Sequence, residues 1–93
     1  MERKVPLHGI RIVDLTWYLA GPQATRILAD CGAEVIKVEH KDRRDQSRLH
    51  EPLVGEKRGI NSSGYFNNFN RSKLSISLNA RHPKGIEILR KLI

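Results

Sequence analysis

Apolar residues recur along the chain with two different spacings. Segment 9–16 alternates apolar and polar residues, which predicts a β-strand, and segment 33–39 repeats that pattern. Between the two strands, four small or apolar residues share one helical face: Ala24, Ile27, Leu28 and Cys31. The implied order is strand, helix, strand.

The breaks between these segments support the same order. Gly21 and Pro22 precede the helical pattern, where a proline suits the first turn, and Gly32 stands where a helix C-terminal cap would fall. Two parallel strands joined by a helix leave a crevice beyond their carboxyl ends, where open α/β sheets bind ligands. We therefore expect the turn 16–22 and the segment after Glu39 to border a ligand site.

The second half of the chain adds one strand and one helix. Segment 40–64 has few apolar residues and reads as a long irregular loop, whereas 74–78 alternates as a third strand. Pro83 opens a helical pattern with three apolar residues on one stripe, Ile86, Leu89 and Ile93, and the chain stops inside this pattern. We expect residues 1–8 to be a polar lead and 9–93 to be the N-terminal part of a larger α/β domain.

Composition narrows the partners without choosing one. The net charge is +7, from 17 Lys and Arg against 10 Asp and Glu, which favours an anionic partner such as nucleic acid, acidic lipid or a phosphorylated cofactor. No apolar run is long enough to span a membrane, and no secretory signal begins the chain. The single cysteine, Cys31, excludes an internal disulfide and a cysteine-rich zinc site, and we expect it to be buried in a protein of the cytoplasm.

Several side chains allow both a chemical and a structural interpretation. Asp14, late in the first strand, is more often a hydrogen-bond acceptor for loop amides than a reacting group. Trp17 and Tyr18 could line an acyl or ring pocket, or could plug the end of the core. Glu39 falls where dinucleotide-binding units hold a ribose, but the G-x-G-x-x-G turn is missing.

Basic residues gather in two later segments. The loop holds six cations that could meet phosphates or form a solvated surface: Lys41, Arg43, Arg44, Arg48, Lys57 and Arg58. Segment 65–73 joins aromatic residues to Arg71 and Lys73, which suits a nucleic acid strand, an adenine nucleotide, or a short helix packed on the sheet.

A series of motifs in order then resembles the class III CoA-transferases, which include formyl-CoA and carnitine CoA-transferases and α-methylacyl-CoA racemases. The motifs lie at residues 9–16, 20–22, 24–25, 28–30, 32–39, 45–48, 65–66, 70–73, 75–78 and 82–85. They cover nearly the whole chain from Leu7 onward.

The resemblance implies a Rossmann-like parallel sheet with flanking helices, here incomplete, that binds coenzyme A. It implies transfer of CoA from an acyl-CoA to a carboxylic acid through an aspartyl intermediate, in an interlocked homodimer without a metal. The residues that match the family's CoA contacts follow the three strands: Leu19, Ala20, His40, Leu78, Asn79, Ala80 and Arg81.

The resemblance also sets limits. The family's nucleophilic aspartate lies downstream of this region, so no catalytic residue is expected in residues 1–93, and this segment alone should be inactive. Formyl-CoA transferases carry a glutamine where this chain has Leu19, so formyl transfer is not expected. Two alternatives stay open: a racemase of the same fold, and a basic nucleic-acid-binding module, which the scattered cations disfavour.

Overall fold

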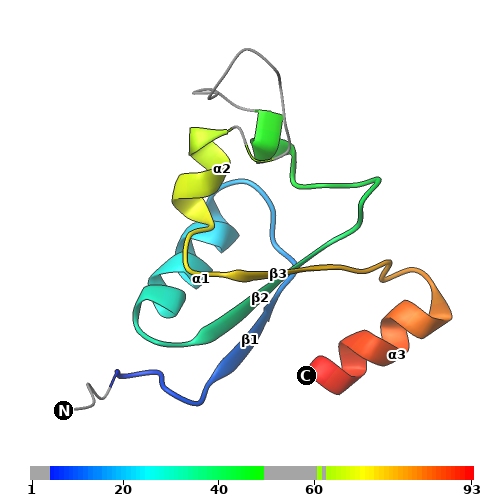
Figure 1. Ribbon diagram of the computed structural model, residues 1–93, viewed down its shortest axis with the longest axis horizontal. Coiled ribbons are helices and arrows are strands. Elements are labelled where there is room, and N and C mark those ends of the chain that lie inside the picture. The colour runs from blue at the N-terminus through cyan, green and yellow to red at the C-terminus, as the bar shows by residue number, and fades with distance from the viewer. Residues whose placement is uncertain (1–4, 50–60, 62) are drawn as a thin grey trace.

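The fold is a three-stranded parallel sheet with helices on both sides. The structure is a computed structural model that describes residues 5–49, 61 and 63–93. Strands β1 (Arg11–Asp14), β2 (Glu34–Glu39) and β3 (Leu74–Ser77) lie in that order, with β2 in the centre (Figure 1). The remaining elements are α1 (Ala20–Asp30), the 3-10 helix η1 (Gln46–Leu49), α2 (Gly64–Phe69) and α3 (Pro83–Leu92). The predicted parallel α/β class is confirmed.

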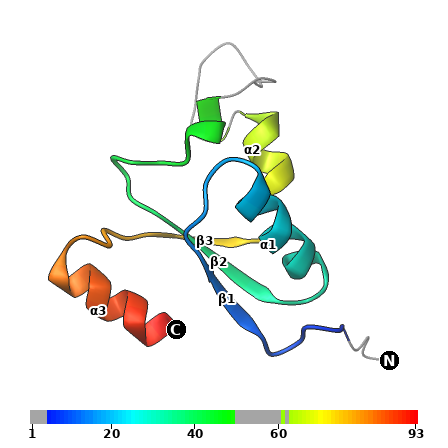
Figure 2. The same cartoon turned by 180° about the vertical axis from the view of Figure 1, so that it is seen from behind.

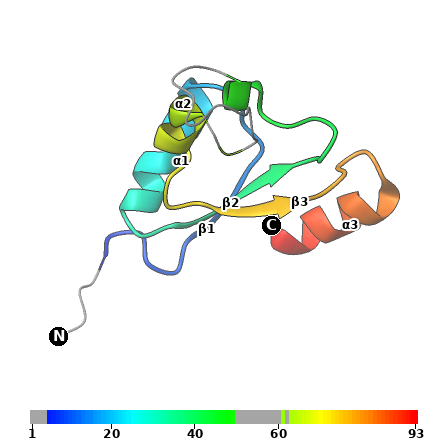
Figure 3. The ribbon, with the colours of Figure 1, turned by 45° about the horizontal axis from the view of Figure 1, so that its top comes forward.

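The helices divide between the two sides of the sheet. Figure 3 shows α1, α2 and η1 on one side, and α3 beyond the carboxyl end of β3. From behind, α3 turns back towards the sheet (Figure 2), and its last residues, Leu92 and Ile93, line a hollow with Arg11, Val13 and Leu15 of β1 and the turn after it. The pairing of Val13 with Ile36, and of Val38 with Ile76, sets the register of the three strands.

The end of α1 is fixed by a glycine cap. The Gly32 N–H donates to Ala29 O at 3.0 Å and the Ala33 N–H to Leu28 O at 3.1 Å, with Gly32 at φ +105°. This pair of bonds is a Schellman motif, which favours glycine because its left-handed conformation is costly for a residue with a Cβ. The predicted helix C-terminus at Gly32 is confirmed.

The predicted buried face of α1 is wrong. Ile27 and Leu28 are 49% and 37% exposed, and the free Cys31 is only half-buried; the buried residues of the helix are Pro22 and Ala29. The reason is that α1 packs on a polar part of the sheet. Thr25 donates to the buried Asp14 at 2.8 Å, so the side of the helix that carries Thr25 faces the sheet. A small residue, Ala29, then packs in the core beside Ala33 and Val35.

The two faces of the sheet differ in polarity. Along β2, Val35, Lys37 and Glu39 point towards α1 and α2, whereas Ile36 and Val38 point to the other side, as the two-residue period of a strand requires. The side of α3 is apolar and only partly covered, since Leu15 and Leu74 remain exposed. Among the described residues, no helix has both the length and the apolar character that a membrane span needs.

We predict that Gly85→Ala disturbs the segment after β3. Gly85 lies in the first turn of α3, and an added Cβ would stand 1.8 Å from the carbonyl oxygen of Asn79. Relieving this clash must move backbone, at a cost of about 1–3 kcal/mol. Thermal unfolding of the full-length protein should show a lower midpoint for this variant, and an unchanged midpoint for the exposed neighbour variant Lys84→Ala. Equal midpoints for the two variants would contradict the contact.

Candidate functional site

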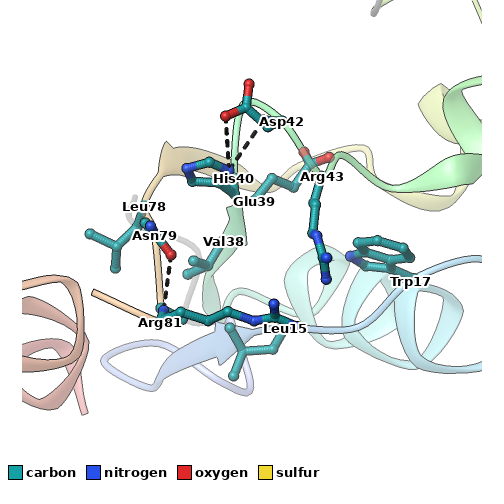
Figure 4. Close-up of a pocket in the computed structure, with 11 residues that line it drawn as sticks. Leu15, Trp17, Val38, Glu39, His40, Asp42, Arg43, Leu78, Asn79 and Arg81 are labelled. Atoms are coloured by element: carbon teal, nitrogen blue, oxygen red, sulfur yellow. Dashed lines mark hydrogen bonds and ion pairs between the residues drawn. The ribbon is translucent and has the colours of Figure 1, made fainter. Parts of the chain in front are cut away.

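A pocket of about 520 Å³ lies at the carboxyl ends of the three strands (Figure 4). Its apolar lining consists of Leu15, Trp17, Val38, Leu78 and Ala80, and its polar lining of Glu39, His40, Asp42, Arg43, Asn79 and Arg81. The pocket lies at the place where the sequence predicts a ligand crevice.

The pocket brings together five of the seven predicted contact residues. His40 follows β2, and the run 78–81 follows β3, so both reach the same end of a parallel sheet. Leu19 and Ala20 do not line this pocket. They stand exposed at the N-terminus of α1, so their predicted role needs a ligand that extends beyond the pocket.

Six lining residues were not among the predicted contacts: Leu15, Trp17, Val38, Glu39, Asp42 and Arg43. Each stands within four residues of a strand's carboxyl end, which is the signal that could have identified them. Trp17, 39% exposed, contributes to the wall as one of its two interpretations proposed. Tyr18 does not line the pocket, because its hydroxyl group donates to the Gln46 side chain.

The carboxylate of Glu39 and the amide oxygen of Asn79 are already hydrogen-bonded within the protein. Glu39 accepts from Arg48 Nη2 at 2.6 Å through one oxygen and from the Asp45 N–H at 2.9 Å through the other. Glu39 therefore serves the fold, and the structure gives no support to a ribose-binding role for this residue. Asn79 Oδ1 accepts from the Arg81 N–H at 3.0 Å, which fixes the turn after β3.

His40 is held by the turn that follows it. Its Nδ1 accepts from the Asp42 N–H at 3.2 Å, so Nδ1 carries no proton in this arrangement. The 3.8 Å approach of Nδ1 to the Asp42 carboxylate is then a contact and not a hydrogen-bonded ion pair. With Nδ1 engaged by the turn, Nε2 is the ring nitrogen that can donate to a bound anion.

A buried ion pair holds together the two segments that follow β1 and β2 at the pocket. Lys37 Nζ lies 2.9 Å from Asp45 Oδ2, with the two side chains 3% and 0% exposed. Lys37 also donates to Thr16 O at 2.9 Å, and Asp45 Oδ1 accepts from the Tyr18 N–H at 3.2 Å. Because Tyr18 has φ +67°, a conformation costly for an aromatic residue, these bonds hold the turn after β1 in place.

Asp14 is a structural residue. Its carboxylate accepts from the Thr16 N–H, from the Thr25 hydroxyl and, at 2.9 Å, from Lys73 Nζ. Burial alone would raise the pKa of Asp14, but the hydrogen bonds from Thr16 and Lys73 outweigh it and lower the pKa from 3.8 to about 2. Asp14 therefore stays ionised and fully bonded, as its structural interpretation proposed.

The aromatic segment packs a short helix onto the rest of the fold. Phe66 of α2 is buried, and the Arg48 guanidinium lies 3.7 Å from the centre of its ring. Lys73 is buried against Asp14. The predicted stacking surface for a nucleic acid strand is therefore not formed by Phe66 and Lys73, while Lys57 and Arg58 lie outside the described residues.

Within the described ranges, no group of three or more His, Cys, Asp or Glu side chains could hold a metal ion. The chemistry that the pocket offers is anion binding by arginine and histidine beside an apolar wall.

Comparison with known proteins identifies the family. The family model described as CoA-transferase family III matches residues 7–93. The chain belongs to this family. A succinyl-CoA:glutarate CoA-transferase of Homo sapiens is 47% identical over 93 residues, which are 99% of the chain and 20% of that protein. A succinate--glutarate CoA-transferase of Agrobacterium fabrum is 43% identical over 94 residues, 99% of the chain and 24% of that protein.

A solved structure of similar sequence shows the same fold. A CAIB/BAIF family protein from Brucella suis is 39% identical, with a TM-score of 0.80, over 97% of the chain and 24% of that structure. The chain thus spans about a fifth to a quarter of the length of these relatives. The predicted family is confirmed.

We predict that the Asp14 network makes stability depend on acid. A pKa lowered from 3.8 to about 2 means that ionised Asp14 contributes about 2 kcal/mol above pH 4, a contribution lost as the pH falls towards 2. Asp14→Asn in the full-length protein should therefore unfold at a much lower temperature than wild type at pH 7, with the difference shrinking towards pH 2. Glu87→Gln, at an exposed carboxylate, is the control and should show little difference at any pH. A gap between Asp14→Asn and wild type that stays constant with pH would contradict the network.

Proposed function

We propose that the chain is the coenzyme-A-binding segment of a transferase that moves CoA from an acyl-CoA to a carboxylic acid. The observation that supports the proposal is the pocket at the strand ends. There His40 and Arg43, which follow β2, meet the run 78–81, which follows β3 and ends in Arg81. Guanidinium groups bind phosphates through paired hydrogen bonds, and CoA carries three phosphate groups at its nucleotide end.

In this proposal the segment binds and positions the coenzyme. His40, Asn79 and Arg81 supply polar contacts, and Leu78 and Ala80 supply an apolar wall, while Leu19 and Ala20 meet a more distant part of the same ligand. The transfer runs through an aspartyl intermediate whose nucleophile lies outside residues 1–93, in a homodimer of the full-length protein. Asp14 takes no part in it, because all of its hydrogen-bonding capacity serves the fold.

The acid that receives CoA is, we infer, a dicarboxylate. The human and Agrobacterium fabrum relatives, at 47% and 43% identity, have names that pair succinyl-CoA or succinate with glutarate. Leu19 stands where formyl-CoA transferases carry a glutamine, which argues against formyl-CoA as the donor. Incubation of the full-length protein with succinyl-CoA and glutarate should yield glutaryl-CoA by chromatography, faster than formyl-CoA and oxalate yield oxalyl-CoA.

The nucleic-acid alternative loses support from the position of the cations. Lys37, Arg48 and Lys73 lie buried in ion pairs with carboxylates, where no polyanion can reach them.

The test is calorimetric titration of the full-length protein with CoA, together with Arg81→Ala. Losing one charge-assisted contact should weaken binding about tenfold. Arg90→Ala, at an exposed arginine of α3 that lines none of the described pockets, is the matched control and should bind as wild type does. Absence of CoA binding by the folded wild-type protein would overturn the proposal.

A further inference from the structure

We propose that Arg43 is a second phosphate-binding residue of this pocket and holds a phosphate of the coenzyme between its own guanidinium and that of Arg81. The inference rests on the proposed function and names a contact that the family resemblance did not supply. Arg43 follows β2 and Arg81 follows β3, so the two cations reach the pocket from adjacent strands.

A tight turn places Arg43 at the rim of the pocket. The Arg43 N–H donates to His40 O at 3.0 Å, and the two residues form an isolated antiparallel bridge. Asp42, at the tip, is tied back to His40 by its own N–H. Because the backbone reverses here, consecutive side chains point in different directions: Figure 4 shows Asp42 pointing away from the pocket and Arg43 pointing into it.

The Arg43 side chain extends towards the part of the pocket that Arg81 also enters. Figure 4 shows both side chains running between the strand ends towards Leu15, with Trp17 beside Arg43. Leu15, Trp17 and Val38 make this part of the wall apolar. An anion bound there would lose water on one side, which strengthens its attraction to the two guanidinium groups.

Among the described residues, neither arginine is paired with a carboxylate. Within residues 5–49, 61 and 63–93, no carboxylate forms an ion pair with the Arg43 or Arg81 side chain, whereas Arg11, Arg48 and Arg71 each have one. Of the two acids in the lining, Glu39 is bound to Arg48 and Asp42 points outward. Two unpaired guanidiniums in one pocket repel each other, and a bound phosphate dianion removes that repulsion.

The next residue in sequence provides a matched control. Arg44 is exposed like Arg43, but it lines a different hollow with Lys41, Ser75 and Ser77. Replacing either arginine by alanine changes the net charge equally. Any difference between the two variants therefore reports the position of the side chain and not the overall charge of the protein.

The experiment is calorimetric titration of the full-length wild type, Arg43→Ala and Arg44→Ala with CoA, dephospho-CoA and pantetheine. Arg43→Ala should weaken CoA binding about tenfold, because it removes a charge-assisted hydrogen bond. Arg44→Ala should weaken it less than about twofold at about 0.15 M salt, because salt screens a charge that does not touch the ligand. Pantetheine, which has no phosphate, should bind all three proteins equally. Dephospho-CoA, which lacks the 3′-phosphate, shows which phosphate Arg43 binds. If Arg43→Ala does not weaken binding of dephospho-CoA, Arg43 binds the 3′-phosphate; if it weakens binding of dephospho-CoA as well, Arg43 binds the diphosphate.

Two outcomes would overturn the inference. One is an equal effect of Arg43→Ala and Arg44→Ala on CoA, which would mean that only net charge matters. The other is the same loss for pantetheine as for CoA, which would mean that Arg43 shapes the pocket without touching a phosphate. In both cases wild type still binds CoA, so the proposed function survives; if wild type binds none of the ligands, the proposed function fails first.

Discussion

The buried pair of Lys37 and Asp45 is the interaction on which the rest of this structure depends. Lys37 lies in the central strand, where an ammonium group without partners would be too costly to bury. Its two acceptors, Asp45 and Thr16 O, come from the segments that follow β2 and β1. The charge is therefore satisfied only when both segments are in place, and those segments form two walls of the pocket.

Two further buried ion pairs lie on the same face of the sheet. Asp14 with Lys73 joins β1 to the entry of β3, and Glu39 with Arg48 fixes η1 against the end of β2. Buried ion pairs add little stability compared with apolar packing, but a wrong register would leave a charge unpaired. We infer that this polar layer specifies the arrangement of the strands. It also explains the orientation of α1, which turns Thr25 towards Asp14 and leaves Ile27 and Leu28 exposed.

The sequence could predict the elements because their signals are local. Alternation identified all three strands, and Gly32 and Pro83 identified a helix end and a helix start from backbone chemistry alone. The buried face of α1 could not be predicted, because it depends on which residues of the sheet lie beneath the helix. The pocket shows the same division. The positions of His40 and Arg81 in it follow from the strand ends and the family resemblance. The position of Arg43 depends on the turn 40–43, which the sequence pattern did not predict.

The positions of the basic residues show where the net positive charge of the chain lies. Lys37, Arg48 and Lys73 are buried against carboxylates, and Arg11 and Arg71 pair with carboxylates at the surface. Each of these five cations is matched by an acid, so none contributes to the net charge of +7. The excess lies on the remaining basic residues, and two of them, Arg43 and Arg81, enter one pocket whose other wall is apolar. A ligand with both phosphates and an apolar portion fits that distribution better than a uniform polyanion does.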